Sequence, residues 1–322
     1  MIRAFAYHDG AVSVVQPADI PREAETRDDG GFIWIHIQAN GDAAHLLDEL
    51  TLDLPPTIDT ALTAVETRPR CEALDAGVLV NLRMPGDVAS AQVGDPLVSL
   101  RLWAEKGLLV SVSLRPTPIM PGVERQFTEG RLHDPGDVII ALATAAAEAI
   151  DTNVADFGDE LDGLECDLGP RSDLSERRKV TRIRTHAIQY RRFVSPQRQA
   201  LERLAQLPLG WLDDLERALL RESADRFARM AEELESIRER SAVLHEELTD
   251  LRAEKMDARS LQIAIVAMIF LPLTFITGLL GMNVKGIPYA DEAWAFWGVV
   301  GVCLALSIAV GGWFAIRGWS RK

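Results

Sequence analysis

The chain has 322 residues, of which 25% are charged, and its formal net charge is −14. This average composition is that of a soluble protein, and the excess of acidic residues argues against a nucleic-acid partner. The charges are unevenly distributed, because Leu261–Val284 has no residue that is ionisable at neutral pH and Ala293–Ile316 has only Cys303. A chain that is water-soluble along its whole length is therefore excluded.

Residues 1–133 are predicted to form an α/β domain in the cytoplasm. Runs rich in apolar and β-branched residues predict strands at residues 4–7, 12–15, 31–37, 77–84, 97–105 and 107–114. Residues 42–52 and 56–65 have helical spacing. Lys106-Gly107 is predicted to be the turn of a hairpin. The region has no catalytic motif and its histidines are scattered, so we expect no enzyme.

Residues 134–259 are predicted to be helical and to form a stalk. Asp134 or Asp137 is expected to cap the first helix, which covers Ala141–Leu168. A second helix is expected over Ser172–Leu207, kinked or broken at Pro196. From about Trp211 there is no proline or glycine before Pro272, which predicts one helix about 90 Å long that continues from the cytoplasm into a membrane.

Residues 260–322 are predicted to cross a membrane twice. Leu261–Leu280 and Trp294–Ile316 are long enough to span a bilayer, and tryptophans mark both ends of the second run. A pair of buried core helices would explain their composition, but not the aromatic ends. Arginine and lysine flank the two spans, whereas Lys285 alone lies in the connecting loop 284–293. This asymmetry predicts cytoplasmic termini and a periplasmic loop.

The long helix has two distinguishable faces. An apolar seam with 3,4 spacing contains Phe227, Met230, Leu234, Ile237, Ser241, Leu244, Leu248 and Leu251. A second stripe contains Glu239, Val243, Glu246, Asp250, Ala253 and Asp257, and continues as Ser260, Ala264, Ala267, Leu271, Thr274, Gly278 and Gly281. The acidic half has the character of a solvated face and the small-residue half that of a packing face. Their continuity favours a pore with an acidic vestibule, which requires an oligomer.

The segment IFLPLTFITGLLGMN, Ile269–Asn283, resembles the first span of the CorA family of divalent-cation transporters and ends in that family's Gly-Met-Asn signature. The segment RRFVSPQRQALERL resembles the family's helix before the stalk. The resemblance implies an α+β fold: an N-terminal α/β cytoplasmic domain, a long stalk helix and two C-terminal transmembrane helices, assembled as a homopentameric funnel. It places the chain in a bacterial cytoplasmic (inner) membrane.

Within the family, GMNVKGIP resembles the zinc-transporting ZntB branch. The alternative is a CorA-type Mg²⁺ or Co²⁺ channel. The resemblance implies uptake of Zn²⁺ together with protons and no tightly bound cofactor. The spans contain no nitrogen or sulfur ligands on the stripe, which fits passage of a hydrated ion and predicts poor discrimination among Zn²⁺, Co²⁺, Ni²⁺ and Cd²⁺. They also contain no carboxylate, histidine, lysine or arginine that would carry a proton.

The family match assigns roles along the stripe. Asn283 forms a ring of amide oxygens that accept hydrogen bonds from a hydrated cation; taken alone, it would be a turn asparagine at the end of the helix. Thr274 provides a polar ring and Leu271 a hydrophobic constriction. The expected selectivity motif is Gly281, Met282 and Asn283, and the expected pore-lining residues are Ser260, Ala264, Ala267, Leu271, Thr274, Gly278 and Leu280.

Acidic residues at the two ends of the stripe are expected to interact with cations. Asp291 and Glu292 are expected to collect cations in the outer loop, although a solvated loop is the simpler interpretation. Glu239, Glu246, Asp250 and Asp257 are expected to attract cations in a cytoplasmic vestibule or to hold a regulatory metal. A different class of function stays open: a membrane-anchored coiled-coil scaffold or receptor, which the variant Asn283→Ala would leave unaffected.

Overall fold

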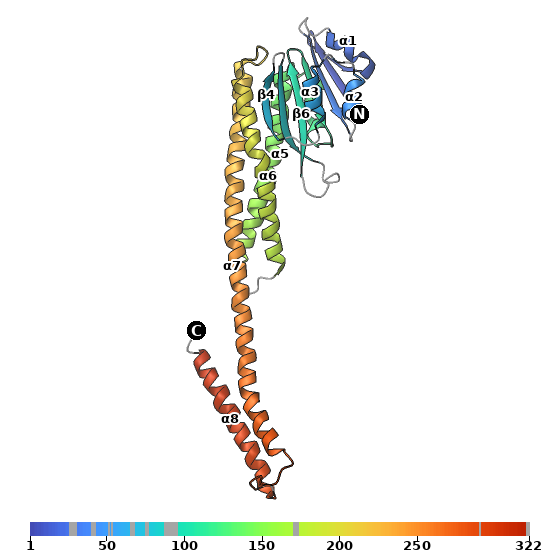
Figure 1. The fold of residues 1–322 in the computed structure, drawn as a ribbon. Helices are drawn as coiled ribbons and strands as arrows, with labels where there is room; N and C mark the ends of the chain where they lie inside the picture. The colour runs from blue at the N-terminus through green and yellow to red at the C-terminus, as the bar shows by residue number, and fades with distance from the viewer. Residues whose placement is uncertain are drawn as a thin grey trace. The chain divides into compact units, whose positions relative to one another are not determined.

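The structure is a computed structural model of the chain. It describes residues 1–25, 31–39, 43–50, 52, 54–64, 68–74, 77–86, 96–169, 174–289 and 291–319. The chain divides into two compact units, Met1–His245 and Glu246–Lys322. The first unit contains a β-sheet with helices on both faces, and the second contains two apolar helical segments (Figure 1).

The described strands of the first unit form one sheet in the order β2-β1-β3-β7-β6-β5-β4. Their bounds are Ile2–His8 (β1), Ala11–Val15 (β2), Phe32–Gln38 (β3), Arg70–Leu74 (β4), Gly77–Pro85 (β5), Leu97–Glu105 (β6) and Leu108–Ser113 (β7). Neighbouring strands are antiparallel except β3 and β7, which are parallel with Ile35 opposite Val110. Every residue of β5 and β7 is buried, as expected for strands that helices cover on both faces.

The six predicted strand segments are confirmed, and so is the hairpin at Lys106-Gly107, which joins β6 to β7. The strand β4 was not predicted. Its sequence, RCEAL, has one buried residue, Cys71, and its pairing with β5 along Arg70↔Asn81 holds it at the edge of the sheet. Local hydrophobicity therefore gave no signal for this strand.

Helices cover the two faces of the sheet. On one face lie α1 (Ile20–Glu25), α2 (Ala43–Asp48) and α3 (Pro56–Thr63), and their side chains share an apolar core with β3 residues such as Ile35. On the other face lie α4 (Met120–Thr128), α5 (Pro135–Cys166) and α6 (Leu174–Gln206). There Phe127 of α4 packs against Trp34 with 5.8 Å between ring centroids.

The helix α6 continues through Pro196, so of the two predicted outcomes, a kink or a break, the break is wrong. The residues beside it are anchored in the core of the unit. Phe193 lies under the guanidinium of Arg83, 4.1 Å from its ring centroid. Gln197 is fully buried, accepts a hydrogen bond from the Arg83 N–H at 2.6 Å and donates one to the Arg83 carbonyl at 3.2 Å. These contacts outweigh the missing proline N–H.

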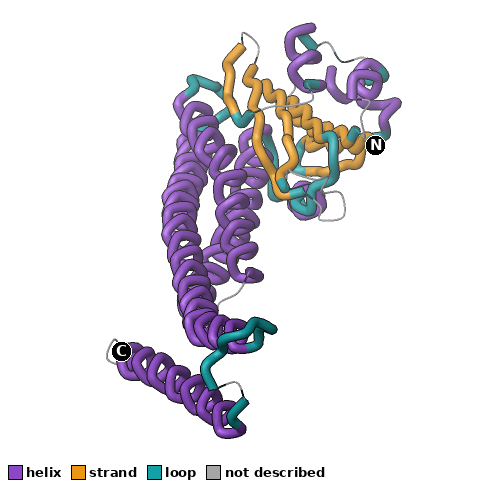
Figure 2. The backbone as a smooth tube through the Cα atoms, turned by 60° about the horizontal axis from the view of Figure 1, so that its bottom comes forward, coloured by secondary structure: helices purple, strands orange, loops and turns teal. Residues whose placement is uncertain are grey.

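The predicted single long helix is confirmed as α7, Asp214–Leu280, which has 67 residues. Its seam is buried from Phe227 to Leu244, where α7 lies beside α5 and α6 (Figures 1 and 2). Ion pairs at the margins of the seam join the helices, such as Arg191 of α6 with Glu235 of α7 at 3.1 Å. The seam therefore explains how the first part of α7 is attached to its unit.

The second unit contains the end of α7 and the helix α8, Ala293–Trp319. Three described helices are long and apolar enough to cross a membrane: α5, α7 and α8. Half of the apolar window of α5 is buried inside the first unit, whereas the windows of α7 and α8 have no buried residue. The contrast favours the two predicted spans over α5.

Candidate functional site

The predicted stripe lies on one face of α7, and most of the other residues from Leu261 to Leu280 are exposed as well. From Ser260 to Gly281 its members are all exposed in the single chain, and Leu271 has 75% of its surface accessible. The single chain leaves the apolar side chain of Leu271 exposed, so lipid or another chain has to cover it. The predicted members are Ser260, Ala264, Ala267, Leu271, Thr274, Gly278 and Gly281. Leu280, also expected to line the pore, is exposed but lies half a turn around the helix from Leu271.

The helix α8 covers a different face of α7. A cavity of about 400 Å³ lies between the two helices and is lined by Leu273 and Thr277 of α7 and by residues of α8 that include Cys303 and Ser307. At 100° per residue, Leu273 lies about 160° and Thr277 about 120° around the helix from Leu271. Since α8 packs on that opposite side, the stripe stays free for contact with another chain.

The tripeptide Gly281-Met282-Asn283 begins where α7 ends. The Gly281 N–H donates to the Thr277 carbonyl at 2.9 Å, and a β-carbon at position 281 would lie 3.0 Å from that same oxygen. Glycine therefore allows the helix to close tightly at this point. Met282 and Asn283 follow in exposed, non-helical backbone, and the Asn283 side chain makes no hydrogen bond to another described residue. Its amide is available to a ligand.

Two threonines of α7 bond to the backbone of their own helix, and the Thr277 hydroxyl also donates to the Thr274 carbonyl at 3.2 Å. The Thr274 hydroxyl donates to the Phe270 carbonyl at 2.8 Å, and the Thr277 hydroxyl donates to the Leu273 carbonyl at 2.9 Å. Each oxygen keeps lone pairs that can accept a hydrogen bond. Thr274 lies on the stripe, and Thr277, about 60° further round the helix, lines the cavity toward α8, so the two hydroxyl groups can be compared.

The structure does not gather the predicted acidic residues into a site within one chain. Asp291 and Glu292 are exposed just before α8, and the Glu292 N–H donates to the Tyr289 carbonyl at 3.1 Å. Glu239, Glu246, Asp250 and Asp257 are also exposed along α7. They follow one another along the helix, so a ring of such residues requires further copies of the chain.

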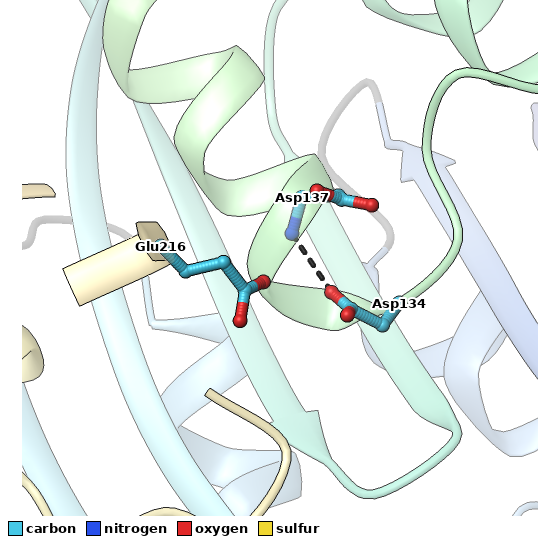
Figure 3. A group of neighbouring side chains, drawn as sticks. All are labelled: Asp134, Asp137 and Glu216. Atoms are coloured by element: carbon cyan, nitrogen blue, oxygen red, sulfur yellow. Dashed lines mark hydrogen bonds between the residues drawn. The ribbon is translucent and has the colours of Figure 1, made fainter. Parts of the chain in front are cut away.

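One acidic cluster that was not predicted lies in the first unit. Asp134 and Asp137 in the first turn of α5 and Glu216 in the first turn of α7 each have a carboxylate oxygen within 4.8 Å of the others (Figure 3). Burial, and next the neighbouring Asp134, raise the pKa of Glu216 to about 8. Burial also raises the pKa of Asp137. Asp134 caps α5, as one of the two predicted alternatives, but Glu216 was not singled out.

Known proteins resemble this chain along most of its length. The family model described as CorA-like Mg²⁺ transporter protein matches residues 29–321. A zinc transport protein ZntB of Pectobacterium atrosepticum is 32% identical over 290 residues, which are 90% of this chain and 86% of that protein. The solved structure of full-length CmaX is 26% identical, covers 98% of this chain and 96% of its own, and has a TM-score of 0.76.

A second solved structure supports the fold alone. The CorA magnesium transporter of Methanocaldococcus jannaschii is 17% identical, with a TM-score of 0.79 over 99% of this chain and 98% of its own. These matches include the soluble sheet, the long helix and the C-terminal helices.

Proposed function

Because this chain belongs to the CorA-like transporter family, we propose that it carries Zn²⁺ into the cell through a pore formed by several copies. The family predicted from the Gly-Met-Asn motif is confirmed, and so are the fold of the single chain and the assignment to divalent-cation transporters rather than enzymes. The observation that carries the proposed pathway is the exposed stripe of α7 that ends in Gly281-Met282-Asn283.

Zinc is favoured by two observations. The relative from Pectobacterium is named a zinc transport protein, and GMNVKGIP is the local sequence that resembles the zinc branch. The second candidate is a Mg²⁺ or Co²⁺ channel, which the description of the family model favours. The stripe offers oxygen atoms and small side chains but no thiolate or imidazole, so the ion would pass with much of its bound water. Co²⁺, Ni²⁺ and Cd²⁺ would then compete with Zn²⁺.

The assembly follows from the two faces of α7. With α8 on the side of Leu273, the stripe on the side of Leu271 can face a common axis, and α8 would lie outside toward lipid. The proposed assembly is a homopentamer in a bacterial inner membrane, with both termini in the cytoplasm and the loop 284–293 in the periplasm. Exposed Asp291 and Glu292 would surround the outer mouth.

The proposed roles follow the order of the stripe. Five Asn283 amides would accept hydrogen bonds from the water bound to the cation, and five Thr274 hydroxyl oxygens would form a polar ring further in. Between the polar ring and the cytoplasm, the Leu271 side chains would form a hydrophobic constriction that gates by dewetting. Glu246, Asp250 and Asp257 would attract the departing cation, and coupled protons would bind outside the spans.

The test is zinc uptake into proteoliposomes that contain the purified protein, with and without an inward proton gradient and with Mg²⁺ as a competitor. Zinc entry that rises with the gradient and is insensitive to Mg²⁺ would support the proposal. Magnesium entry that does not depend on the gradient would replace it with the second candidate. A pore should lose transport in Asn283→Ala without losing its assembly, whereas a membrane-anchored scaffold would show no transport to lose.

A comparison of variants at Thr274 and Thr277 tests the pathway in more detail. Thr274→Val should slow Zn²⁺ uptake about tenfold, the effect of removing about 1.4 kcal/mol of stabilisation from the rate-limiting barrier. Thr277→Val removes a hydroxyl at the margin of the stripe, beside the cavity toward α8, and should slow the uptake less than Thr274→Val. Equal effects of the two variants would refute the assignment of the stripe to the pathway.

A further inference from the structure

The first turns of α5 and α7 meet at Asp134, Asp137 and Glu216. Each carboxylate has one oxygen held by a backbone N–H: Asp134 Oδ1 accepts from Asp137 at 2.9 Å, and Asp137 Oδ2 accepts from His133 at 2.9 Å. Glu216 Oε2 accepts from Asp213 at 2.6 Å. The second oxygen of each carboxylate is left for another partner, and the fixed first oxygen limits where that second oxygen can lie.

The Glu216 carboxylate has one oxygen atom that lacks a hydrogen-bond partner among the described residues. The side chain is only 5% exposed, and this oxygen atom, Oε1, is buried. Figure 3 shows this carboxylate directed toward that of Asp134. Two facing carboxylates repel each other unless one of them takes up a proton or a cation lies between them. A buried acceptor of this kind costs folding free energy when it stays unsatisfied.

We infer that Asp134, Asp137 and Glu216 bind one hard divalent cation, of the Mg²⁺, Ca²⁺ or Mn²⁺ class, in the soluble unit. The ligand atoms are all carboxylate oxygens, which these cations prefer, whereas structural Zn²⁺ sites use thiolate and imidazole. The mutual distances of up to 4.8 Å are within reach of oxygen ligands that lie on different sides of one ion. The site is thus distinct in its chemistry from a pathway for hydrated Zn²⁺.

The charge at the cluster fits a divalent ion. Three carboxylates face two helix N-termini, each equivalent to about half a positive charge. About two negative charges therefore remain uncompensated when all three carboxylates are ionised. The helix ends hold the carboxylates through their N–H groups, and the cation would bind the opposite oxygens. Asp137 keeps 31% of its side chain exposed, which leaves a side from which the ion can enter.

A cation at this position would join the start of α7 to the start of α5 within the first unit. Glu216 also belongs to the capping pair of α7, because its own N–H donates to Asp213 Oδ1 at 2.7 Å. The ion would therefore fix the first turn of the long helix. This inference stands apart from transport, since none of its three ligands belongs to the stripe.

The test measures binding of Mn²⁺ to the full-length protein in detergent, by the loss of the electron paramagnetic resonance signal of free Mn²⁺. Glu216→Gln and Asp134→Asn remove a charge, yet glutamine and asparagine still accept the hydrogen bonds that cap the two helices. The wild type should bind one more Mn²⁺ per chain than either variant, or bind it about 10–100-fold more tightly. Mg²⁺ or Ca²⁺ should displace this ion.

Asp214→Asn is the matched control, because Asp214 lies exposed in the same first turn of α7 and outside the cluster. It should bind Mn²⁺ like the wild type. Equal binding by Glu216→Gln, Asp134→Asn and the wild type would overturn the inference. So would a wild type that is stabilised by acidification but not by Mn²⁺, since a shared proton would then satisfy Glu216.

Discussion

Replacing Gln197 tests how the helix layer is held to the sheet. The Gln197 side chain bonds both the N–H and the carbonyl of Arg83 in β5, at 2.6 and 3.2 Å, and it has no exposed surface. The pairing of β4 with β5 ends at Asn81, and at Arg83 the Gln197 side chain provides the backbone hydrogen bonds that a neighbouring strand would otherwise make. Gln197→Ala would remove the partners of two buried backbone groups.

The expected cost follows from these two groups. A buried backbone donor or acceptor that loses its partner costs about 1–3 kcal/mol, so Gln197→Ala should lower the free energy of unfolding by about 2–5 kcal/mol. For a part of the chain this size, a loss of about 3 kcal/mol corresponds to a fall in Tm of about 6–12 °C. Gln197→Met keeps most of the side-chain volume and should be nearly as destabilising, because the hydrogen bonds are lost in both.

The assay is thermal unfolding of the full-length variants in detergent, followed by tryptophan fluorescence. Gln206→Ala provides the control, since Gln206 is exposed at the end of the same helix. It should shift Tm by no more than an ordinary surface substitution, within about 0.5 kcal/mol. If Gln197→Ala shifts Tm no further than Gln206→Ala, the two hydrogen bonds do not stabilise the junction.

Three further predictions concern the first unit. Burial lowers the pKa of His36 to about 3, so between pH 6.5 and pH 5 the unfolded chain takes up a proton at His36 and the folded unit does not. The free energy of unfolding should therefore fall by about 2 kcal/mol over this pH range. Chemical unfolding at the two pH values should show a smaller fall for His36→Gln. Phe227→Ala in the buried seam should lower the free energy of unfolding by about 3–5 kcal/mol, as urea titration would measure; a value under 1 kcal/mol would contradict the packing of α7. Arg240→Ala breaks two partly exposed ion pairs, with Glu165 and with Asp162, and should cost about 1 kcal/mol by the same titration.

The elements that could be predicted from the sequence are those whose patterns are local. The strand around Ile35 and the seam of α7 show their periodicity within a single segment. Pro196 was misjudged because the rule for proline in helices describes the backbone alone. Arg83, which contacts Phe193 and Gln197, belongs to a strand more than 100 residues earlier in the chain. The helix α6 continues through the proline position as one element.

The candidate pathway was visible in the sequence for the same reason. The stripe from Ser260 to Gly281 lies on one helix, so its spacing alone predicts a shared face. Which face α8 covers could not be predicted, because the side chains that line the cavity beside Leu273 come from another helix. The structure shows that α8 packs on the side of Leu273, and Leu271 stays exposed.

The acidic cluster could not be predicted, because helix capping accounts for every one of its residues separately. Asp134 followed by Asp137, and Asp213 followed by Glu216, are each the ordinary start of a helix. Their meeting depends on Gly136, where a β-carbon would overlap the Glu216 carboxylate. The absence of a side chain there lets a carboxylate from α7 lie against the first turn of α5. Two ordinary caps become one site only because the fold brings the two helix starts together.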